Sequence, residues 1–445
     1  MLGPIERSKS EIMSKRPNTS GPSIGALARA LLLLRAAAGA KWALADQIVV
    51  SGSNFLTNIL LARILGIEEF GRYVLAWTIV LFVQGLQYSA VSSTMLSIGS
   101  KQEPEAARSY FGSMFVLQGI FAAASAVLTL VGAYVGDAAF PALRLDTIAL
   151  PLAVAVLSSQ TQDFLRRYFF SVDRLKVSFS IDAIRYMGQN IAILALIRWF
   201  PANSAAALWL VSAAAAVGSL AILPYVPSLK CSLRAILSAG LHGWHFSKWL
   251  VASTLLVFVF TNLFTFAAGI FLGAAAVGAM RAAFTLVSIA NIVIEACVNV
   301  VPVRASRTFM SSGRRGLIAY LKNVTIYGTG AIAFLLGVIV VAPKFWLRLF
   351  FGPEFESYWT LVPWYAGVQV LIFLGLVIGT WYRTLESTRF IFYANVFAVI
   401  LLLLIAYPLI TNFGVTGAVA GLLIGQFALQ AFMFMGVRLG SGLTT

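Results

Sequence analysis

Two arginines and a glutamate lie in stretches that are otherwise apolar enough to cross a membrane. Arg281, Ser288, Glu295 and Asn299 follow one another at intervals of seven, seven and four residues, with Asn291 beside the row. In one continuous helix these intervals place the side chains on a single face. Arg281 and Glu295 would then lie about 21 Å apart along the axis, too far to pair. Since a charged group in a bilayer needs a partner or water, the row predicts the wall of a wet cavity, with polar packing between helices as the alternative.

Arg185 is the second arginine in an apolar stretch, and Asp182 precedes it by three residues. One interpretation is an ion pair between these two neighbours on a helix. The other is that Arg185 projects into the cavity, where a planar guanidinium suits phosphate. Arg185 and Arg281 are therefore candidate contacts for an anionic substrate.

The first two apolar stretches add polar side chains to the predicted cavity. They are Asn54, Thr57, Gln84 and Tyr88. Polar rows of this kind also form hydrogen bonds between helices, so both interpretations stay open. Asp46 and Glu295 are the candidates for binding a coupling cation or proton, although Asp46 is close enough to the membrane edge to be simply solvated.

Motifs for metal binding and hydrolysis are missing. His242 and His245 belong to no HExxH pattern, and there is no GxxxxGK[ST] loop and no serine-elbow motif. The two cysteines, Cys231 and Cys297, do not form a disulfide framework. The sequence therefore predicts no metal site, no cofactor and no enzyme.

The amino-acid composition indicates that this chain lies in a membrane. Of its 445 residues, 60% are hydrophobic and 11% are charged, whereas soluble domains carry about 25% charged residues. Apolar runs of about twenty residues recur along the chain, which suits helices that span a bilayer. The runs do not alternate as barrel strands do. We expect an all-α polytopic membrane protein with about twelve transmembrane helices in two six-helix halves around a central cavity.

The expected spans and domains are as follows. The spans are 43–62, 70–97, 109–133, 146–165, 179–198, 204–224, 248–271, 277–301, 320–342, 358–381, 390–411 and 414–437. The domains are a cytoplasmic tail with an amphipathic basic segment at 1–41, an N-terminal six-helix half at 42–224, a cytoplasmic linker at 225–247, a C-terminal six-helix half at 248–438 and a cytoplasmic tail at 439–445.

The basic residues set the predicted orientation. With a cytoplasmic N-terminus, 24 of the 32 Lys and Arg residues fall in inside segments and 6 in outside connections, and the other two are Arg185 and Arg281. Cytoplasmic loops carry such an excess of basic residues. The sequence therefore predicts that both termini are cytoplasmic, and it gives no reason to expect nucleic acid as a partner.

A weak internal repeat supports the two halves. Leu65-Gly66 and Leu272-Gly273 each follow one span and open the next, and Phe70-Gly71 and Val277-Gly278 follow them at the same distance. Internal repeats of this kind are common in transporters, which bind substrate between the repeats.

A longer motif at residues 54–75 points to a family. The element Leu61-Ala62-Arg63-Ile64-Leu65-Gly66, followed by Glu69-Phe70-Gly71-Arg72-Tyr73, is similar to the first loop of the polysaccharide transporter family. That family belongs to the multidrug/oligosaccharidyl-lipid/polysaccharide flippase superfamily. Asp46 also matches a polar position often seen in the first span. The resemblance extends over residues 40–440 as an agreement of layout.

The resemblance implies a flippase of the O-antigen and exopolysaccharide type. Such a protein moves an isoprenoid-diphosphate-linked oligosaccharide from the cytoplasmic to the outer leaflet of a bacterial inner membrane by alternating access. Its partners would be the lipid-linked sugar, membrane lipids, and a glycosyltransferase or polymerase of the same pathway. A cation-coupled drug or small-molecule antiporter of the same superfamily is the alternative.

Overall fold

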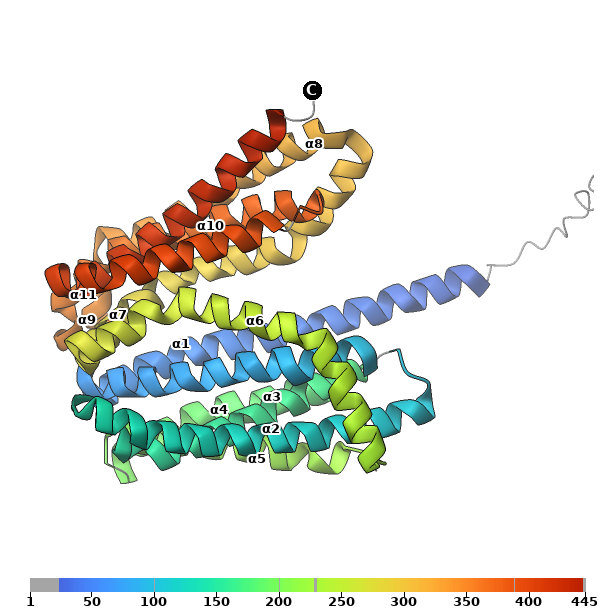
Figure 1. The fold of residues 1–445 in the computed structure, drawn as a ribbon, viewed down its shortest axis with the longest axis horizontal. Coiled ribbons are helices and arrows are strands. Elements are labelled where there is room, and N and C mark those ends of the chain that lie inside the picture. Colours follow the sequence, from blue (N-terminus) through green and yellow to red (C-terminus); the bar gives the residue numbers. More distant parts are fainter. Residues whose placement is uncertain (1–23, 100, 200, 228–229, 388, 443–445) are drawn as a thin grey trace, which may run out of the picture.

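A computed structural model describes residues 24–442, apart from residues 100, 200, 228–229 and 388. Side chains are described from residue 47 to residue 437, apart from those positions and residues 104–105, 142 and 196–198. Within these limits the chain is helical and has no strand (Figure 1). The predicted all-α fold is confirmed, whereas the side chains of the predicted tail at 1–41 lie outside the described residues.

Eleven α-helices form the described part of the chain. They are α1 Ile24–Gln87, α2 Pro104–Ala139, α3 Ala149–Ser171, α4 Leu175–Trp199, α5 Ser204–Ile222, α6 Leu233–Leu272, α7 Ala274–Val287, α8 Asn291–Val341, α9 Pro343–Phe350, α10 Leu361–Thr384 and α11 Arg389–Gly442. Two short 3₁₀ helices matter below, η6 (Ser288–Ala290) and η7 (Pro353–Tyr358). The predicted linker at 225–247 is largely helical, because α6 begins at Leu233.

Three of the long helices reverse direction at one glycine. Gly66 in α1, Gly313 in α8 and Gly414 in α11 have φ angles of 75°, 63° and 58°, a region open to glycine but costly for other residues. Gly273, between α6 and α7, has φ 88° and ψ 174°, close to the 75° and 173° of Gly66. The two Leu-Gly pairs of the repeat therefore make the same turn.

The helices run roughly side by side, so the molecule has two ends (Figure 1). We call the end with Gly66, Gly273 and Gly414 the Gly66 end, and the opposite end the Gly313 end. Among the described residues, eight helical segments are long and apolar enough to cross a membrane. Three of these contain a reversing glycine, and α4 is not among the eight. Twelve crossings therefore stay a prediction.

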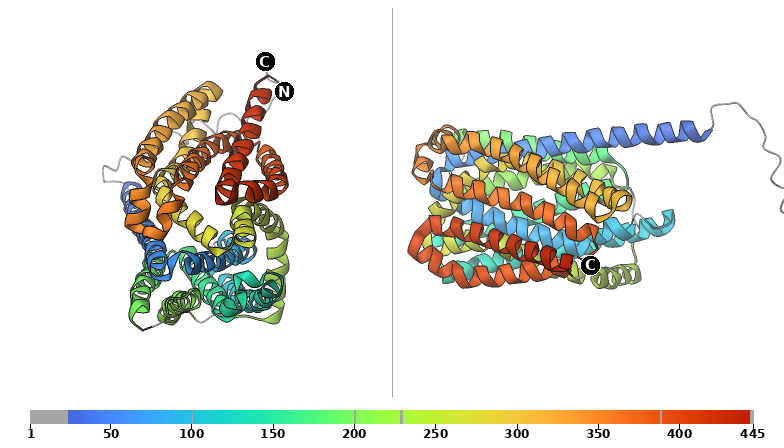
Figure 2. Two further views of the ribbon diagram at one scale, coloured as in Figure 1. Left: turned by 90° about the vertical axis from the view of Figure 1, so that its left-hand side faces the viewer. Right: turned by 90° about the horizontal axis from the view of Figure 1, so that it is seen from above.

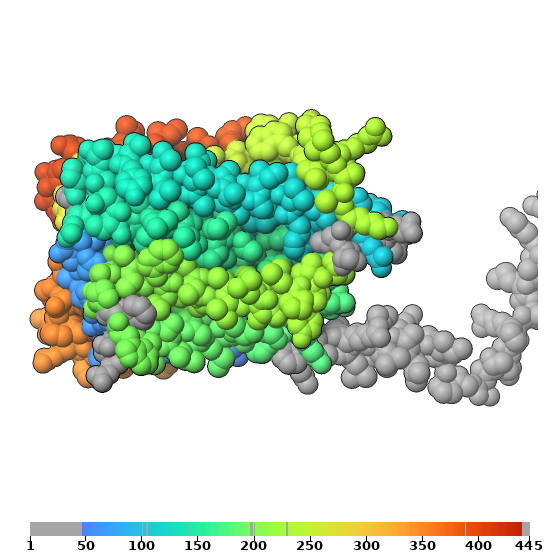
Figure 3. Space-filling model, turned by 90° about the horizontal axis from the view of Figure 1, so that it is seen from below, coloured from blue at the N-terminus to red at the C-terminus, as the bar shows by residue number. Residues whose placement is uncertain are grey.

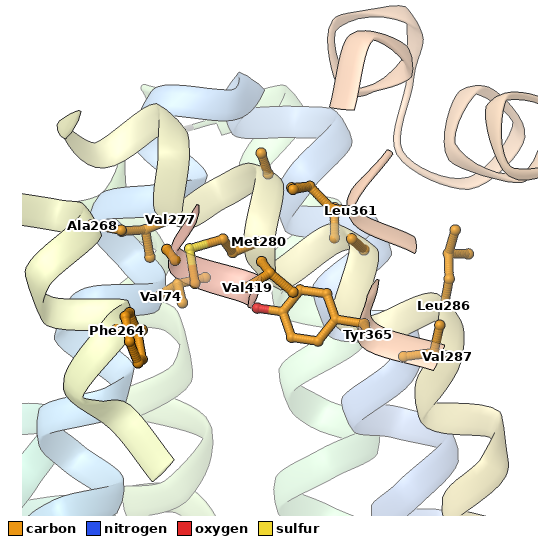
Figure 4. Close-up of a cluster of buried hydrophobic side chains, with 14 of the residues drawn as sticks. Val74, Phe264, Ala268, Val277, Met280, Leu286, Val287, Leu361, Tyr365 and Val419 are labelled. Atoms are coloured by element: carbon orange, nitrogen blue, oxygen red, sulfur yellow. The ribbon is translucent and has the colours of Figure 1, made fainter. Parts of the chain in front are cut away.

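The helices gather in two groups. Helices α2 to α5 pack together beside α1, whereas α8 packs on α10, and α10 on α11 (Figure 2). Helices α1 and α7 join the groups, and α6 packs on α11. Side chains from α1, α6, α7, α10 and α11 meet in a shared apolar core that includes Val74, Phe264, Met280 and Val419 (Figure 4).

The outer faces of the bundle are apolar. Figure 3 shows the face made by α2 and α5, where Leu128 and Leu220 are 72% and 63% exposed. Phe334 on α8 and Leu404 on α11 are also exposed. Large exposed apolar surfaces on every side suit contact with lipid tails.

Candidate substrate cavity

A cavity of about 300 Å³ lies between five helices. Its walls come from α1, α6, α7, α10 and α11, the same helices that meet in the shared core. The polar side chains that line it are Thr78, Thr261, Asn262, Thr265, Arg281, Tyr365 and Gln426. Phe260 and Phe284 add aromatic rings. Among these described lining residues, Arg281 is the only charged one.

Arg281 projects from α7 into this cavity without an acidic partner. Its Nε donates a hydrogen bond to Asn58 Oδ1 of α1 over 3.0 Å. Its guanidinium carbon lies 5.7 Å from the ring centre of Phe284. No described carboxylate forms an ion pair with it, and its electrostatic neighbours are Tyr73 and Tyr365. Arg281 is half-buried, and a cation that is partly removed from water without an anion beside it is costly, so this site is suited to an anionic ligand.

Arg185 is buried in the other group of helices and does not line the cavity. Its guanidinium donates hydrogen bonds to Gln162 Oε1 and, over 3.5 Å, to Ser159 Oγ. Asp182, the partner considered from the sequence, instead pairs with Arg166 of α3. It also accepts a hydrogen bond from Gln162 Nε2 over 2.7 Å.

Tyr73 connects the two arginines. It is 3% exposed on α1 and interacts electrostatically with both Arg281 and Arg185. Both guanidinium groups therefore lie near one tyrosine, although only Arg281 lines the cavity.

The polar residues of the first two spans mostly hold helices together. Thr57 donates to Asn190 Oδ1 over 2.9 Å and accepts from Gln189 Nε2 over 2.8 Å, which ties α1 to α4. Gln84 Nε2 reaches the carbonyl oxygen of Ser159 over 3.4 Å. Tyr88 is 41% exposed, and its ring lies 4.3 Å from the guanidinium of Arg167.

Asn54 is exposed, and its backbone carbonyl oxygen accepts a hydrogen bond from Asn58 Nδ2 over 2.7 Å. Asn58 is thus the first-span residue that touches Arg281. Tyr365 and Gln426, which also line the cavity, were not among the residues predicted from the sequence.

The predicted row of the eighth span does not form one face. Helix α7 ends at Val287, η6 follows, and α8 begins at Asn291. Since a 3₁₀ turn holds about 3.0 residues instead of 3.6, the side chains beyond it rotate relative to Arg281. Glu295 and Asn299 are exposed, and the Asn299 side chain donates to the backbone of Glu295 over 2.9 Å.

Ser288 of that row and Asn291 beside it form hydrogen bonds outside the cavity lining. Ser288 Oγ donates to the carbonyl of Thr285 over 2.6 Å. Asn291 Oδ1 accepts from Gln369 Nε2 of α10 over 3.1 Å. Asp46 lies outside the residues whose side chains are described. Across the described part of the chain no cluster of three or more His, Cys, Asp or Glu residues could hold a metal ion.

The sequence profile of the family described as "Polysaccharide biosynthesis protein" matches residues 36–307. The succinoglycan biosynthesis transport protein ExoT of Rhizobium meliloti (strain 1021) is 28% identical over 263 residues, which cover 58% of this chain and 51% of ExoT. The chain therefore spans about half the length of that relative. The lipopolysaccharide biosynthesis protein WzxC of Escherichia coli (strain K12) is 20% identical over 395 residues, covering 88% of this chain and 78% of WzxC.

Solved transporters share the fold. The lipid II flippase MurJ in an inward closed conformation matches with a TM-score of 0.64 at 12% identity, over 89% of this chain and 87% of MurJ. An inward-facing multidrug resistance MATE family transporter matches with a TM-score of 0.68 at 14% identity, over 88% of this chain and 94% of the transporter. With the family profile covering more than half of its length, this multi-pass membrane chain belongs to the polysaccharide biosynthesis protein family and has the fold of transporters, as the motif at residues 54–75 predicts.

Proposed function

We propose that the protein is a flippase for an isoprenoid-diphosphate-linked oligosaccharide, which it moves from the cytoplasmic to the outer leaflet. The observation that carries this proposal is Arg281, a cation in a cavity with no described acid beside it. A diphosphate would supply the missing negative charge, and a guanidinium binds phosphate oxygens in pairs. Relatives named for succinoglycan transport and lipopolysaccharide biosynthesis support the same substrate class.

The rest of the cavity suits a sugar. Asn262, Thr265 and Gln426 offer neutral donors and acceptors for hydroxyl groups, and Phe260 and Phe284 offer flat apolar surfaces. The lipid tail would stay in the bilayer, beside the apolar outer faces of the bundle. The protein would work beside the glycosyltransferases or polymerase that make and use its substrate.

The transport cycle would be alternating access, with the Gly66 end facing outward. Helices α1 and α7 join the two groups of helices, and the groups would rock against each other there. Arg185 would act as a second positive charge behind Tyr73. Glu295, exposed on α8, and Asp46 are kept as candidates for a coupling ion.

The cavity argues against a drug/cation antiporter, the alternative considered from the sequence. A site for cations needs carboxylates or an acidic surrounding, and none is found among the described lining residues. An arginine that lines the cavity without a carboxylate beside it would repel a cationic drug.

Reconstituted protein tests the proposal. The probe is a fluorescent isoprenyl-diphosphate sugar in liposomes, and its arrival in the opposite leaflet is followed with an impermeant quencher. Arg281→Ala is expected to reduce flipping at least tenfold, Arg281→Lys to retain part of it, and the exposed Arg348→Ala to leave it unchanged. Equal flipping by Arg281→Ala and the parent protein would refute the assignment, and efflux of a cationic dye without flipping would favour the antiporter.

A further inference from the structure

The family motif contacts the C-terminal group of helices at the Gly66 end. Arg63 and Ile67 lie on either side of the Gly66 turn of α1, and they bind the segment formed by α9 and η7. These partners are almost three hundred residues apart in the chain. The function proposed above leaves these contacts unexplained.

The first contact caps the end of α9. Arg63 Nε donates to the carbonyl oxygen of Phe350 over 2.7 Å, and its Nη2 donates to the carbonyl of Leu349. The last carbonyls of a helix have no partner inside the helix and carry a partial negative charge. The guanidinium group of Arg63 donates hydrogen bonds to these carbonyl oxygens, and its positive charge interacts favourably with their partial negative charge.

The second contact caps the helix that starts after the turn. Because Gly66 breaks α1, the N–H of Ile67 becomes free at a new helix start, and Glu354 Oε2 accepts it over 3.2 Å. A carboxylate at a helix start is favoured by the positive end of the helix dipole. Arg63 of α1 thus caps the end of α9, and Glu354 of η7 caps the part of α1 that starts after Gly66.

Aromatic rings close the space beside these caps. Phe70 and Phe355 are 0% and 1% exposed, and their ring centres lie 6.2 Å apart, edge to face. Phe55 and Phe350 meet at 6.0 Å in a similar arrangement. The buried Phe70 and Phe355 thus form an apolar contact between α1 and the α9–η7 segment beside the exposed caps.

We propose that these residues form an outer latch that closes the Gly66 end, and that transport requires it to open. This latch is defined as Arg63, Ile67 and Phe70 against Phe350, Glu354 and Phe355. The proposal rests on the alternating access proposed above. Arg63 and Glu354 are both exposed, so water replaces their lost hydrogen bonds when the latch opens, and the cost of opening stays small.

Glu69, in the same motif, makes a contact within one group of helices. Its Oε2 accepts bonds from the backbone N–H and the hydroxyl of Ser204 at 2.8 and 2.7 Å, and Arg72 pairs with its other oxygen over 2.7 Å. That contact joins α1 to α5 inside one group of helices. The motif therefore anchors α1 to its own group through Glu69 and to the other group through Arg63.

Cysteine labelling tests the latch without any substrate. In a protein with Cys231→Ser and Cys297→Ser, Thr265→Cys reports on the cavity, and an impermeant maleimide is added on the side of the Gly66 end. A separate Ser357→Cys protein, exposed on η7, verifies that the reagent reaches this end. Arg63→Ala and Glu354→Ala are expected to raise the labelling rate of Thr265→Cys about tenfold, the effect of about 1.4 kcal/mol.

The conservative variant separates the hydrogen bond from the charge. Glu354→Gln keeps an oxygen that accepts the Ile67 N–H, so it should restore most of the protection that Glu354→Ala loses. Arg348→Ala is the matched control, because Arg348 pairs with Glu356 over 3.9 Å within the same α9–η7 segment and does not touch α1 in that pair.

Two outcomes would overturn the latch. One is an unchanged labelling rate in both alanine variants at normal protein levels in the membrane. The other is an equal rise in the Arg348→Ala control. A reducible cross-link between cysteines introduced at Ile67 and Glu354 should block labelling until it is reduced, which covers the case of poor folding in the alanine variants. If labelling responds as expected but the isoprenyl-diphosphate sugar is not flipped, the latch stands and the proposed substrate falls.

Discussion

Gly71 of α1 and Gly278 of α7 face each other where the two groups of helices join. A β-carbon on Gly71 would overlap the carbonyl oxygen of Ala274, and one on Gly278 would overlap the carbonyl oxygen of Ile67. Each glycine therefore allows the backbone of the other helix to approach, as small residues do between membrane helices. The pair belongs to the repeat, since Gly71 follows Gly66 and Gly278 follows Gly273 by five residues each.

Replacing either glycine should separate these helices. Gly71→Ala or Gly278→Ala is expected to lower the free energy of unfolding by about 1–3 kcal/mol, because the added methyl group meets rigid backbone. Thermal unfolding of the purified protein in detergent measures the change. Gly330→Ala is the control, since nothing lies within 4 Å of a β-carbon there. A control that is destabilised as much as the two test variants would show that the effect is not local.

Asn58 should orient Arg281 without binding substrate itself. Asn58→Ala removes the acceptor for Arg281 Nε, and we expect substrate affinity to fall about threefold to tenfold, the effect of losing one hydrogen bond of about 0.7–1.4 kcal/mol. KM and kcat in the liposome assay measure it. In an Arg281→Ala background the same change should have no further effect, and additive losses would contradict the idea.

The ion pair between the partly exposed Arg166 and the buried Asp182 should be costly to break from the Arg166 side. The Asp182 side chain is 1% exposed, so Arg166→Gln leaves a buried carboxylate without its cation and is expected to cost about 3–5 kcal/mol of stability. Asp182→Asn in the same protein should recover much of the loss. Melting temperatures of the two single variants and the double variant form the test. Strict additivity would argue against an ion pair that contributes to folding.

Glu69 should make stability fall in acid. It lies between the first two predicted spans. Burial raises the pKa of its carboxyl group, but the hydrogen bonds from Ser204 and the charge of Arg72 outweigh burial and lower the pKa below 4.5.

Since the folded pKa lies below the unfolded one, the stabilisation is present above about pH 4.5 and is lost as the pH falls through the folded pKa. Glu69→Gln should therefore have a lower melting temperature than the parent protein at pH 7 and a smaller difference at pH 3.5. A difference that does not shrink in acid would contradict this assignment.

The sequence was informative where a local rule decides the structure. The Leu65-Gly66 and Leu272-Gly273 pairs predicted an internal repeat, and the structure gives both glycines the same turn, because a helix that reverses within one residue needs positive φ and hence glycine. The motif around Arg63 likewise identified the family. These features depend on a few neighbouring residues.

The cavity was predicted less well, because it depends on how distant helices meet. The prediction that Arg281 to Asn299 share one face assumed one continuous helix. The 3₁₀ helix η6 interrupts it, so the side chain of Glu295 is rotated about the helix axis relative to Arg281. Arg185 and Thr57 look like cavity residues in a sequence, but their bonds to Gln162 and Asn190 bury them between helices. Tyr365 and Gln426 were not predicted, because whether they face the cavity depends on how α10 and α11 pack against α1, α6 and α7.

The single-glycine turns also decide what the Gly66 end presents to other molecules. Gly66, Gly273 and Gly414 each reverse the chain within one residue. The connections at these positions therefore have almost no loop that a protease could cut or an antibody could bind. The connection from 342 to 360, with α9 and η7, is the longest described one at that end. Antibody fragments raised against this end should therefore select the α9–η7 segment, and those that cover Glu354 should arrest the carrier in one state.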